Sequence, residues 1–159
     1  MAERRHLKLA NPAPDEDLSD LEGFVGYNLK RAYVILQADF RAALGEDGLA
    51  PRVFSALSLV VQFPDITQSR LAQRLNIERS GLVAIIDELE QRGYLQRTTV
   101  PADRRVQALV PTAEGIAAYE DARRKVQRHE DDLLSDMSAG EKRTLIALLQ
   151  RIRAKGETE

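Results

Sequence analysis

The stretch ITQSRLAQRLNIERSGLVAIIDELEQRGYLQR, Ile66–Arg97, decides the fold. Its apolar residues recur at helical spacing in two short segments, which are separated by a tight turn near Asn76. Thr67 is an N-cap residue type at the start of the first segment. The second segment runs from about Arg79 to Gln91, and Gly93 follows it as a C-terminal glycine. Two short helices joined by such a turn predict a helix-turn-helix.

Two strand-like segments follow the second helix directly. Residues Tyr94–Thr99 are rich in aromatic and β-branched side chains, and Val106–Val110 reads as the returning strand. The sequence VPADRR, Val100–Arg105, is then the loop of a hairpin. A helix-turn-helix with a hairpin behind it predicts a winged helix, whose loop carries two adjacent arginines.

The rest of the chain reads as helix. Apolar residues at spacings of three and four predict one helix over 18–44, and a second helix opens with Pro51 in its first turn. Thr112 begins a long helix over 113–134, and a capping box of Ser138 and Glu141 begins the last one. The expected fold class is mainly α with a small β-hairpin wing.

Composition excludes several classes of protein and site. The 159 residues include no cysteine, so disulfides, thiolate metal sites and cysteine redox sensing are impossible. Two distant histidines make no metal-ligand spacing, and no apolar run is long enough to span a bilayer. We therefore expect a cytoplasmic protein without metal, cofactor or membrane partner. Ser-His-Asp order, a phosphate loop and a paired-carboxylate cleft are also missing, which argues against an enzyme.

The net charge of −2 excludes a uniformly basic nucleic-acid binder. Residues 64–112, however, hold seven arginines against six acidic residues, so a local basic face remains open.

The run from Ile66 to Gly115 resembles the MarR family of bacterial transcriptional regulators. The resemblance rests on the helix-turn-helix block, on the Asp103-x-Arg105 wing signature and on VPTAEG, Val110–Gly115. It extends over about residues 18–153, and it implies a homodimer with two winged lobes and a small-molecule effector. The expected domains are a flexible arm (1–17), dimerisation and ligand helices (18–62), the winged lobe (63–112) and C-terminal dimerisation helices (113–155).

The same reading assigns contacts to double-stranded DNA. Arg79 and Ser80 would read base edges, and Val83 with Ala84, which replace a frequent Thr-Arg pair of the family, would touch thymine methyl groups. In the wing, Arg105 would enter a groove, braced by Asp103, while Arg104 would bind phosphate. The remaining predicted DNA contacts are Thr67, Gln68 and Arg74.

Effector contacts are predicted at Tyr27, Arg31, Tyr33, Arg52 and Phe54, a set that suits an aromatic anion. Residues 26–40 resemble family members that regulate aromatic-acid breakdown, some of which respond to hydroxycinnamoyl-CoA thioesters. The effector would then be an aromatic carboxylate or its CoA thioester. The alternative is that these arginines are ordinary surface charge and the tyrosines belong to a core or interface.

Other side chains are given structural roles. Asp87 and Arg97 are expected to pair, Glu88 and Glu90 to form a solvated face, and His129 to lie on a plain helix surface. A competing function is a winged helix that serves only protein contacts and binds no specific DNA, which the apolar Val83-Ala84 pair keeps open.

Overall fold

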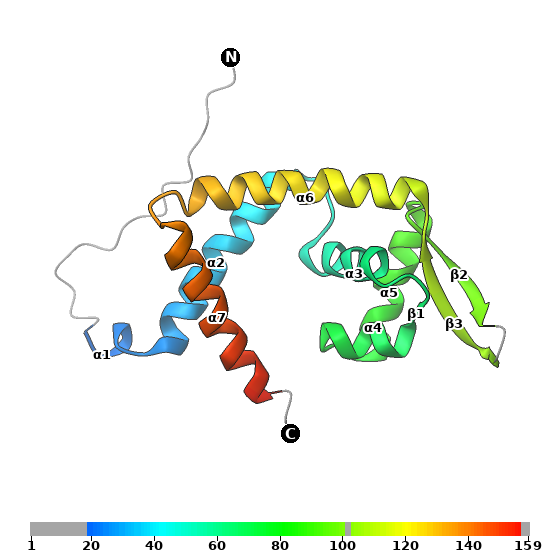
Figure 1. The fold of residues 1–159 in the computed structure, drawn as a ribbon, viewed down its shortest axis with the longest axis horizontal. Helices are drawn as coiled ribbons and strands as arrows, with labels where there is room; N and C mark the ends of the chain where they lie inside the picture. The colour runs from blue at the N-terminus through cyan, green and yellow to red at the C-terminus, as the bar shows by residue number, and fades with distance from the viewer. Residues whose placement is uncertain (1–18, 101–102, 157–159) are drawn as a thin grey trace, which may run out of the picture. The chain divides into compact units, whose positions relative to one another are not determined.

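The computed structural model describes residues 19–100 and 103–156, which are mainly helical with one small sheet (Figure 1). Contacts divide the chain into two units, one ending at Ile35 and the other beginning at Leu36. The predicted fold class is confirmed, because the helices are joined by a single antiparallel sheet in the expected place. The predicted N-terminal arm lies outside the described residues.

The helix predicted over residues 18–44 is interrupted after its first turn. The structure has α1 (Ser19–Glu22) and α2 (Val25–Leu44) in its place. The side-chain amide of Asn28 donates to the carbonyl oxygen of Glu22 at 2.7 Å. This bond satisfies a carbonyl group at the end of α1 that a continuous helix would have paired.

Three helices and the sheet share one hydrophobic core. The helices are α3 (Pro51–Gln62), α4 (Gln68–Leu75) and α5 (Arg79–Gln91), and each turns its apolar stripe inward. Burying one such leucine or isoleucine contributes about 1.5–3 kcal/mol, so this core holds the two helices of the helix-turn-helix at a fixed angle. The largest fully buried side chains are Leu57, Leu71, Leu82, Ile86, Leu89, Leu95 and Leu109.

The predicted helix ends are confirmed. The Thr67 hydroxyl oxygen accepts from the backbone N–H of Arg70 at 3.3 Å and caps α4. Asn76 ends that helix with φ at 50°, a left-handed conformation that asparagine tolerates. Gly93, with φ at 73°, follows the last turn of α5, where a residue without Cβ is favoured.

The sheet has three strands where a two-stranded hairpin was predicted. Strand β3 (Asp103–Pro111) lies between β1 (Ile66–Thr67) and β2 (Leu95–Val100), and both pairings are antiparallel. The short strand β1 was missed because two residues carry no alternation pattern. It places Ile66 opposite Leu109 and so attaches the start of α4 to the wing.

The wing strands are longer than predicted, and the loop prediction was wrong in extent. Val100 belongs to β2 and residues 103–105 belong to β3, so only residues 101 and 102, which lie outside the described part, separate the strands. Thr99 pairs with Gln107, but Val100 pairs with Asp103. The register therefore skips residues 104–106 on β3, and both wing arginines fall in this irregular stretch.

The helix α6 (Ala113–Leu133) is attached to the lobe at its first turn. The Thr112 hydroxyl accepts from the backbone N–H of Gly115 at 2.9 Å and donates to the carbonyl oxygen of Gly93 at 2.6 Å. A Cβ at position 115 would lie 1.9 Å from the carbonyl oxygen of Tyr94, so only glycine fits there. The T-x-x-G sequence thus docks α6 against the end of α5.

The last helix, α7 (Ala139–Gly156), begins with the predicted capping box. The Ser138 hydroxyl donates to the Glu141 carboxylate at 2.7 Å, its backbone N–H donates at 2.8 Å, and these bonds hold the pKa of Glu141 below its ordinary value. Neither α2 nor α7 buries a single residue.

Candidate nucleic-acid interface

Helix α5 presents its predicted reading residues outward. Its buried stripe, which includes Leu82 and Ile86, fixes the rotation of the helix in the core. The four residues of α5 that were predicted to contact bases are all solvent-exposed, and Val83 among them is 43% exposed although it is apolar. The four are Arg79, Ser80, Val83 and Ala84. These side chains are thus placed to meet a partner that approaches the helix-turn-helix.

The N-terminal end of α4 is attached to the wing. Thr67 is half-buried as the cap of α4, and the Gln68 side-chain amide donates to the side-chain oxygen of Gln107 on β3 at 3.1 Å. These two predicted contact residues therefore have defined positions before any partner binds.

Arg74 is exposed in the last turn of α4, and its guanidinium carbon lies 4.0 Å from the centroid of the Phe63 ring. Stacking of this kind holds a guanidinium by its face and leaves the N–H donors around its edge open. This arrangement keeps Arg74 usable as a phosphate contact.

The recognition helix and the wing are joined by Arg97. Its side chain, only 27% exposed, reaches from β2 to the carboxylates of Asp87 and Glu90 on α5, with Glu90 at 2.9 Å. The predicted pairing of Asp87 and Arg97 is confirmed. Glu90 is exposed and Glu88 half-buried on the face that was predicted to be solvated, and both also form ion pairs that were not predicted, Glu90 with Arg97 and Glu88 with Arg92 at 3.0 Å.

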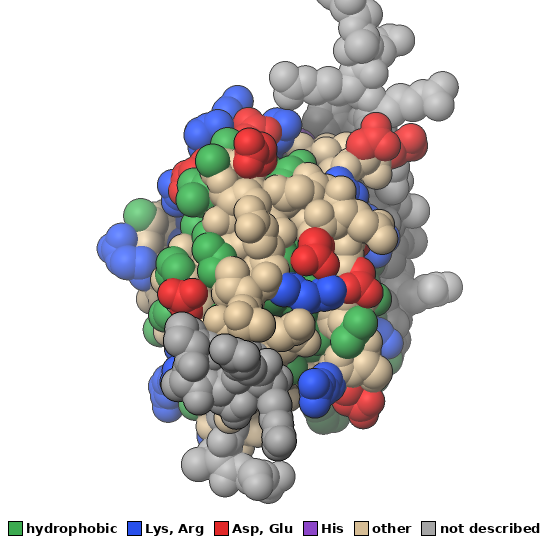
Figure 2. All heavy atoms as spheres, turned by 90° about the vertical axis from the view of Figure 1, so that its right-hand side faces the viewer, with side chains coloured by type: hydrophobic (Ala, Val, Ile, Leu, Met, Phe, Trp, Pro, Cys, Tyr) green, Lys and Arg blue, Asp and Glu red, His purple; other side chains and the backbone are tan. Residues whose placement is uncertain are grey.

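For the two wing arginines, the structure describes the backbone only. Asp103, Arg104 and Arg105 lie in β3 next to the tip, and their side chains fall outside the described part. The bracing of Arg105 by Asp103 stays a prediction. Among the side chains that are coloured by type on the face of the molecule that includes the wing, basic and acidic ones are interspersed (Figure 2).

The predicted effector residues are found in both units. In the first unit, Arg31 donates to the Tyr27 hydroxyl at 3.2 Å, with its guanidinium carbon 5.6 Å from the centroid of that ring, and Tyr33 is 58% exposed on the same helix. Arg52 is exposed at the start of α3.

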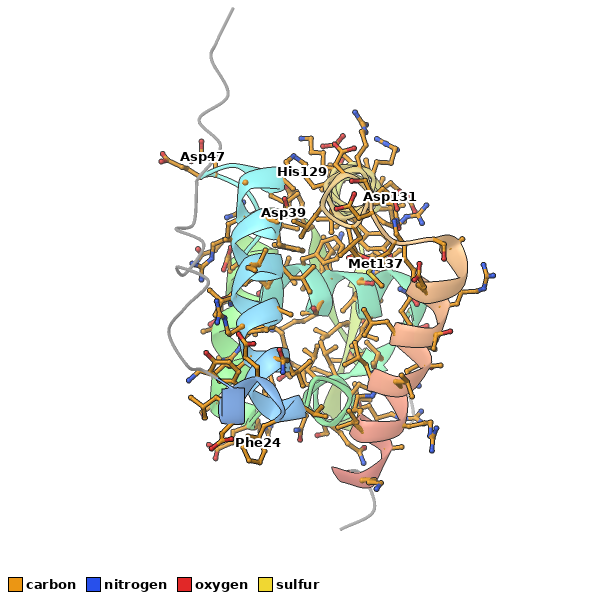
Figure 3. All side chains as sticks on the ribbon, turned by 90° about the vertical axis from the view of Figure 1, so that its left-hand side faces the viewer. Phe24, Asp39, Asp47, His129, Asp131 and Met137 are labelled. Carbon is orange, nitrogen blue, oxygen red and sulfur yellow. The ribbon has the colours of Figure 1, made fainter. Side chains whose placement is uncertain are left out.

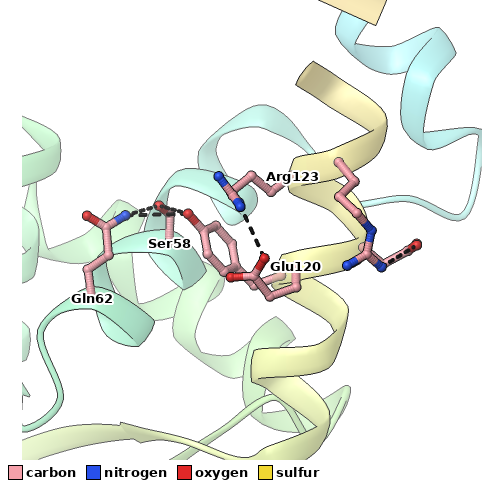
Figure 4. A network of polar contacts seen from close by, with 7 residues as sticks. Ser58, Gln62, Glu120 and Arg123 are labelled. Carbon is pink, nitrogen blue, oxygen red and sulfur yellow. Dashed lines mark hydrogen bonds and ion pairs between the residues drawn. The ribbon is translucent and has the colours of Figure 1, made fainter. Parts of the chain in front are cut away.

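Phe54 belongs to an aromatic cluster inside the second unit. Its ring lies 5.4 Å from that of Phe40 and 5.7 Å from that of Tyr119, measured between centroids. The Tyr119 hydroxyl meets Ser58 at 3.3 Å, and the Gln62 amide donates to Ser58 at 2.8 Å (Figure 4). Sequence reasoning missed this polar group, although Ser58 and Gln62 are one helical turn apart on α3.

His129 is not the plain surface residue that was predicted. Its Nδ1 lies 3.2 Å from the Asp39 carboxylate of α2, and Figure 3 shows the two side chains facing each other. The contact spans 90 residues of sequence, so no local pattern indicates it.

Within residues 19–100 and 103–156, no group of three or more histidine, cysteine, aspartate or glutamate side chains is placed to hold a metal ion. The helices described over the same residues are too short or too polar to cross a membrane.

Comparisons with known proteins agree with this geometry. The sequence profile of the MarR family matches residues 47–106. A relative from Thauera aromatica, described as a transcriptional regulatory protein for the hcr operon, is 31% identical over 151 residues, which are 91% of each chain.

Two solved structures of the transcriptional repressor CouR are also similar. The structure bound to a 23-mer DNA duplex is 34% identical with a TM-score of 0.83, over 87% of this chain and 99% of that one. The structure bound to p-coumaroyl-CoA is 33% identical with a TM-score of 0.76, over 86% and 96%. The matching proteins are transcriptional regulators and not enzymes.

Replacing Arg97 by methionine should lower the free energy of unfolding by about 1–3 kcal/mol, because it leaves two facing carboxylates without their shared cation. Urea denaturation measures this. The matched control is Arg124→Met, which removes an exposed ion pair with Asp121 on α6 and should cost less than about 1 kcal/mol. Equal losses in the two variants would show that Arg97 is an ordinary surface charge.

Proposed function

The chain belongs to the MarR family of transcriptional regulators, and from this premise we propose that it is a repressor acting in the cytoplasm. It binds a palindromic operator in double-stranded DNA as a homodimer and is released by a small aromatic acid or its CoA thioester. The observation that carries the proposal is the contact of Arg97 on β2 with Asp87 and Glu90 on α5. It connects the wing to the recognition helix, so that both can contact the same duplex.

Each element has a defined role on the duplex. Helix α5 enters the major groove, where Arg79 and Ser80 read base edges and the small apolar pair beside them meets thymine methyl groups. The wing, with Arg104 and Arg105, follows the adjacent backbone or minor groove. The first helix of a helix-turn-helix crosses the phosphate backbone, which gives Thr67, Gln68 and Arg74 their contacts.

A homodimer is supported by apolar side chains that the single chain leaves in solvent. Helix α7 exposes five aliphatic side chains along its length, and the first unit exposes a second set around the start of α2. Patches of this kind mark interaction sites. The exposed residues are Leu145, Ile146, Leu148, Leu149 and Ile152 on α7, and Leu21, Phe24, Val25 and Leu29 in the first unit.

A dimer places two recognition helices on successive major grooves of one face of the duplex. Half-sites one helical turn apart lie about 34–36 Å from centre to centre, and their symmetry follows that of the protein. The operator is therefore a palindrome.

The effector is proposed from the pair of Tyr27 and Arg31, which offers an aromatic face beside a cation, and from the exposed Arg52 and the Phe54 cluster. The CouR structure with p-coumaroyl-CoA supports the same ligand class. Release from DNA requires that the ligand bind the DNA-incompetent arrangement more tightly than the competent one.

Selection of duplexes from a random pool, followed by titration with salt, tests the DNA-binding proposal. The affinity should fall steeply as salt rises, because phosphate contacts release counterions. Arg105→Ala should weaken binding to all sequences and reduce the salt slope by about 1, whereas Arg79→Ala should also relax base preference. A flat salt response would favour the competing protein-contact function, for which the exposed Val83 would be the docking residue.

Calorimetry with p-coumarate, ferulate and their CoA esters tests the effector proposal. At least one of them should bind and should release the protein from its selected duplex, and Arg31→Gln should weaken that binding. Arg128→Gln, an exposed arginine on α6, is the control and should bind as the parent does. Absence of heat from all four compounds contradicts the proposed ligand class.

A further inference from the structure

Gly81 is a glycine that the fold does not require. It is the third residue of α5, it is exposed, and its backbone is helical with no positive φ. A Cβ built there meets nothing within 4 Å. Glycine in a helix is less favourable than alanine, because it loses more conformational freedom on folding. The free protein would thus be more stable with alanine at this position.

Two other glycines near α5 are required by contacts or backbone geometry within the chain. Gly93 has a positive φ of 73°, and Gly115 has no room for a side chain beside Tyr94. No contact among the described residues requires glycine at position 81. Gly26 is equally open, but Gly81 lies on the helix proposed to enter DNA, so the space beside it is available to the duplex.

The position of Gly81 on the helix indicates which part of the DNA would approach it. Residues two apart on an α-helix point about 200° apart, so Gly81 and Val83 occupy opposite flanks of α5. Ser80 and Ala84 lie between these flanks, directly away from the buried stripe of Leu82 and Ile86. If Ser80 and Ala84 face the floor of a major groove, Val83 and Gly81 face its two walls.

The fit of a helix in that groove is tight. An α-helix with its side chains is about 10–12 Å in diameter, and the major groove of B-DNA is about 12 Å wide. The clearance is therefore at most about 2 Å, and a larger side chain on either flank limits how closely the short residues approach the bases. Ser80 and Ala84 are short, so deep insertion is a condition for any contact that they make.

We propose that Gly81 sets how closely α5 approaches the bases in the DNA interface. Its missing side chain lets one wall of the major groove approach the backbone of α5, and this closeness brings Arg79 and Ser80 to the base edges. The inference rests on the proposed operator binding. It adds Gly81 to the residues proposed for DNA binding, because the absence of a side chain there lets the duplex approach the helix.

Adding a side chain at position 81 should raise the thermal stability of the protein and lower its affinity for DNA. Gly81→Ala should raise the Tm, because alanine favours the helix and restricts the unfolded chain. It should weaken binding to the selected duplex about tenfold, the factor that corresponds to one lost contact in a specific interface. Gly81→Val should weaken binding further, since the larger side chain holds the helix farther from the bases.

The experiment uses the full chain and the duplex that the parent selects from a random pool. Fluorescence anisotropy at fixed salt gives the affinity, and thermal unfolding gives the Tm of the same preparations. Gly140→Ala is the matched control, because Gly140 is also an exposed glycine in the first turn of a helix but lies on α7. Its DNA affinity should equal that of the parent.

A Gly81→Ala protein that binds as tightly as the parent overturns the inference and leaves the proposed function standing. A raised Tm together with weakened DNA binding supports the inference. If Gly81 had only a structural role, the Tm and the DNA affinity would change in the same direction. A parent that selects no duplex overturns the proposed function and this inference together.

Discussion

The contact of Arg97 with Asp87 and Glu90 joins the two elements that must meet one DNA duplex. Leu95 and Leu109 of the wing strands share the hydrophobic core with α5, and the Arg97 contacts add a second connection between helix and wing. The guanidinium is only partly exposed, and a charge in such a site is stable only when it is paired. The proposed DNA interface, which includes the wing arginines and the exposed face of α5, depends on how this helix and the wing are held together.

The same rigidity continues into α6. Its first turn is bound to the lobe through Gly115, whose lack of a side chain admits the backbone of Tyr94, and near its far end His129 meets Asp39 of α2. At 1.5 Å per residue the 21-residue helix is about 30 Å long. A displacement of the C-terminal half of α2 would therefore be transmitted to the winged lobe through one stiff helix, as the proposed ligand control of DNA binding requires.

Local patterns in the sequence predicted most of the lobe. Helical periodicity and a C-terminal glycine placed α5 at Arg79–Gln91, as observed, because both signals lie within a few residues. The two-residue strand Ile66–Thr67 was not predicted, since its pairing partner is about 40 residues away. The contact of His129 with Asp39, which spans 90 residues, was missed for the same reason. Glu90 is only seven residues from Arg97, but which acidic residue of α5 faces the wing depends on how helix and strand pack. Effector residues depend on packing between distant helices, so sequence alone supplies only candidates for them.

The central claim is that recognition helix and wing engage one duplex together, twice per dimer. A hydroxyl-radical footprint combined with methylation interference on the selected duplex tests it most directly. Two half-sites one helical turn apart are expected, each with guanine interference in the major groove and with protection of the adjacent backbone by the wing. Major-groove interference without the flanking protection, or one half-site alone, would contradict it.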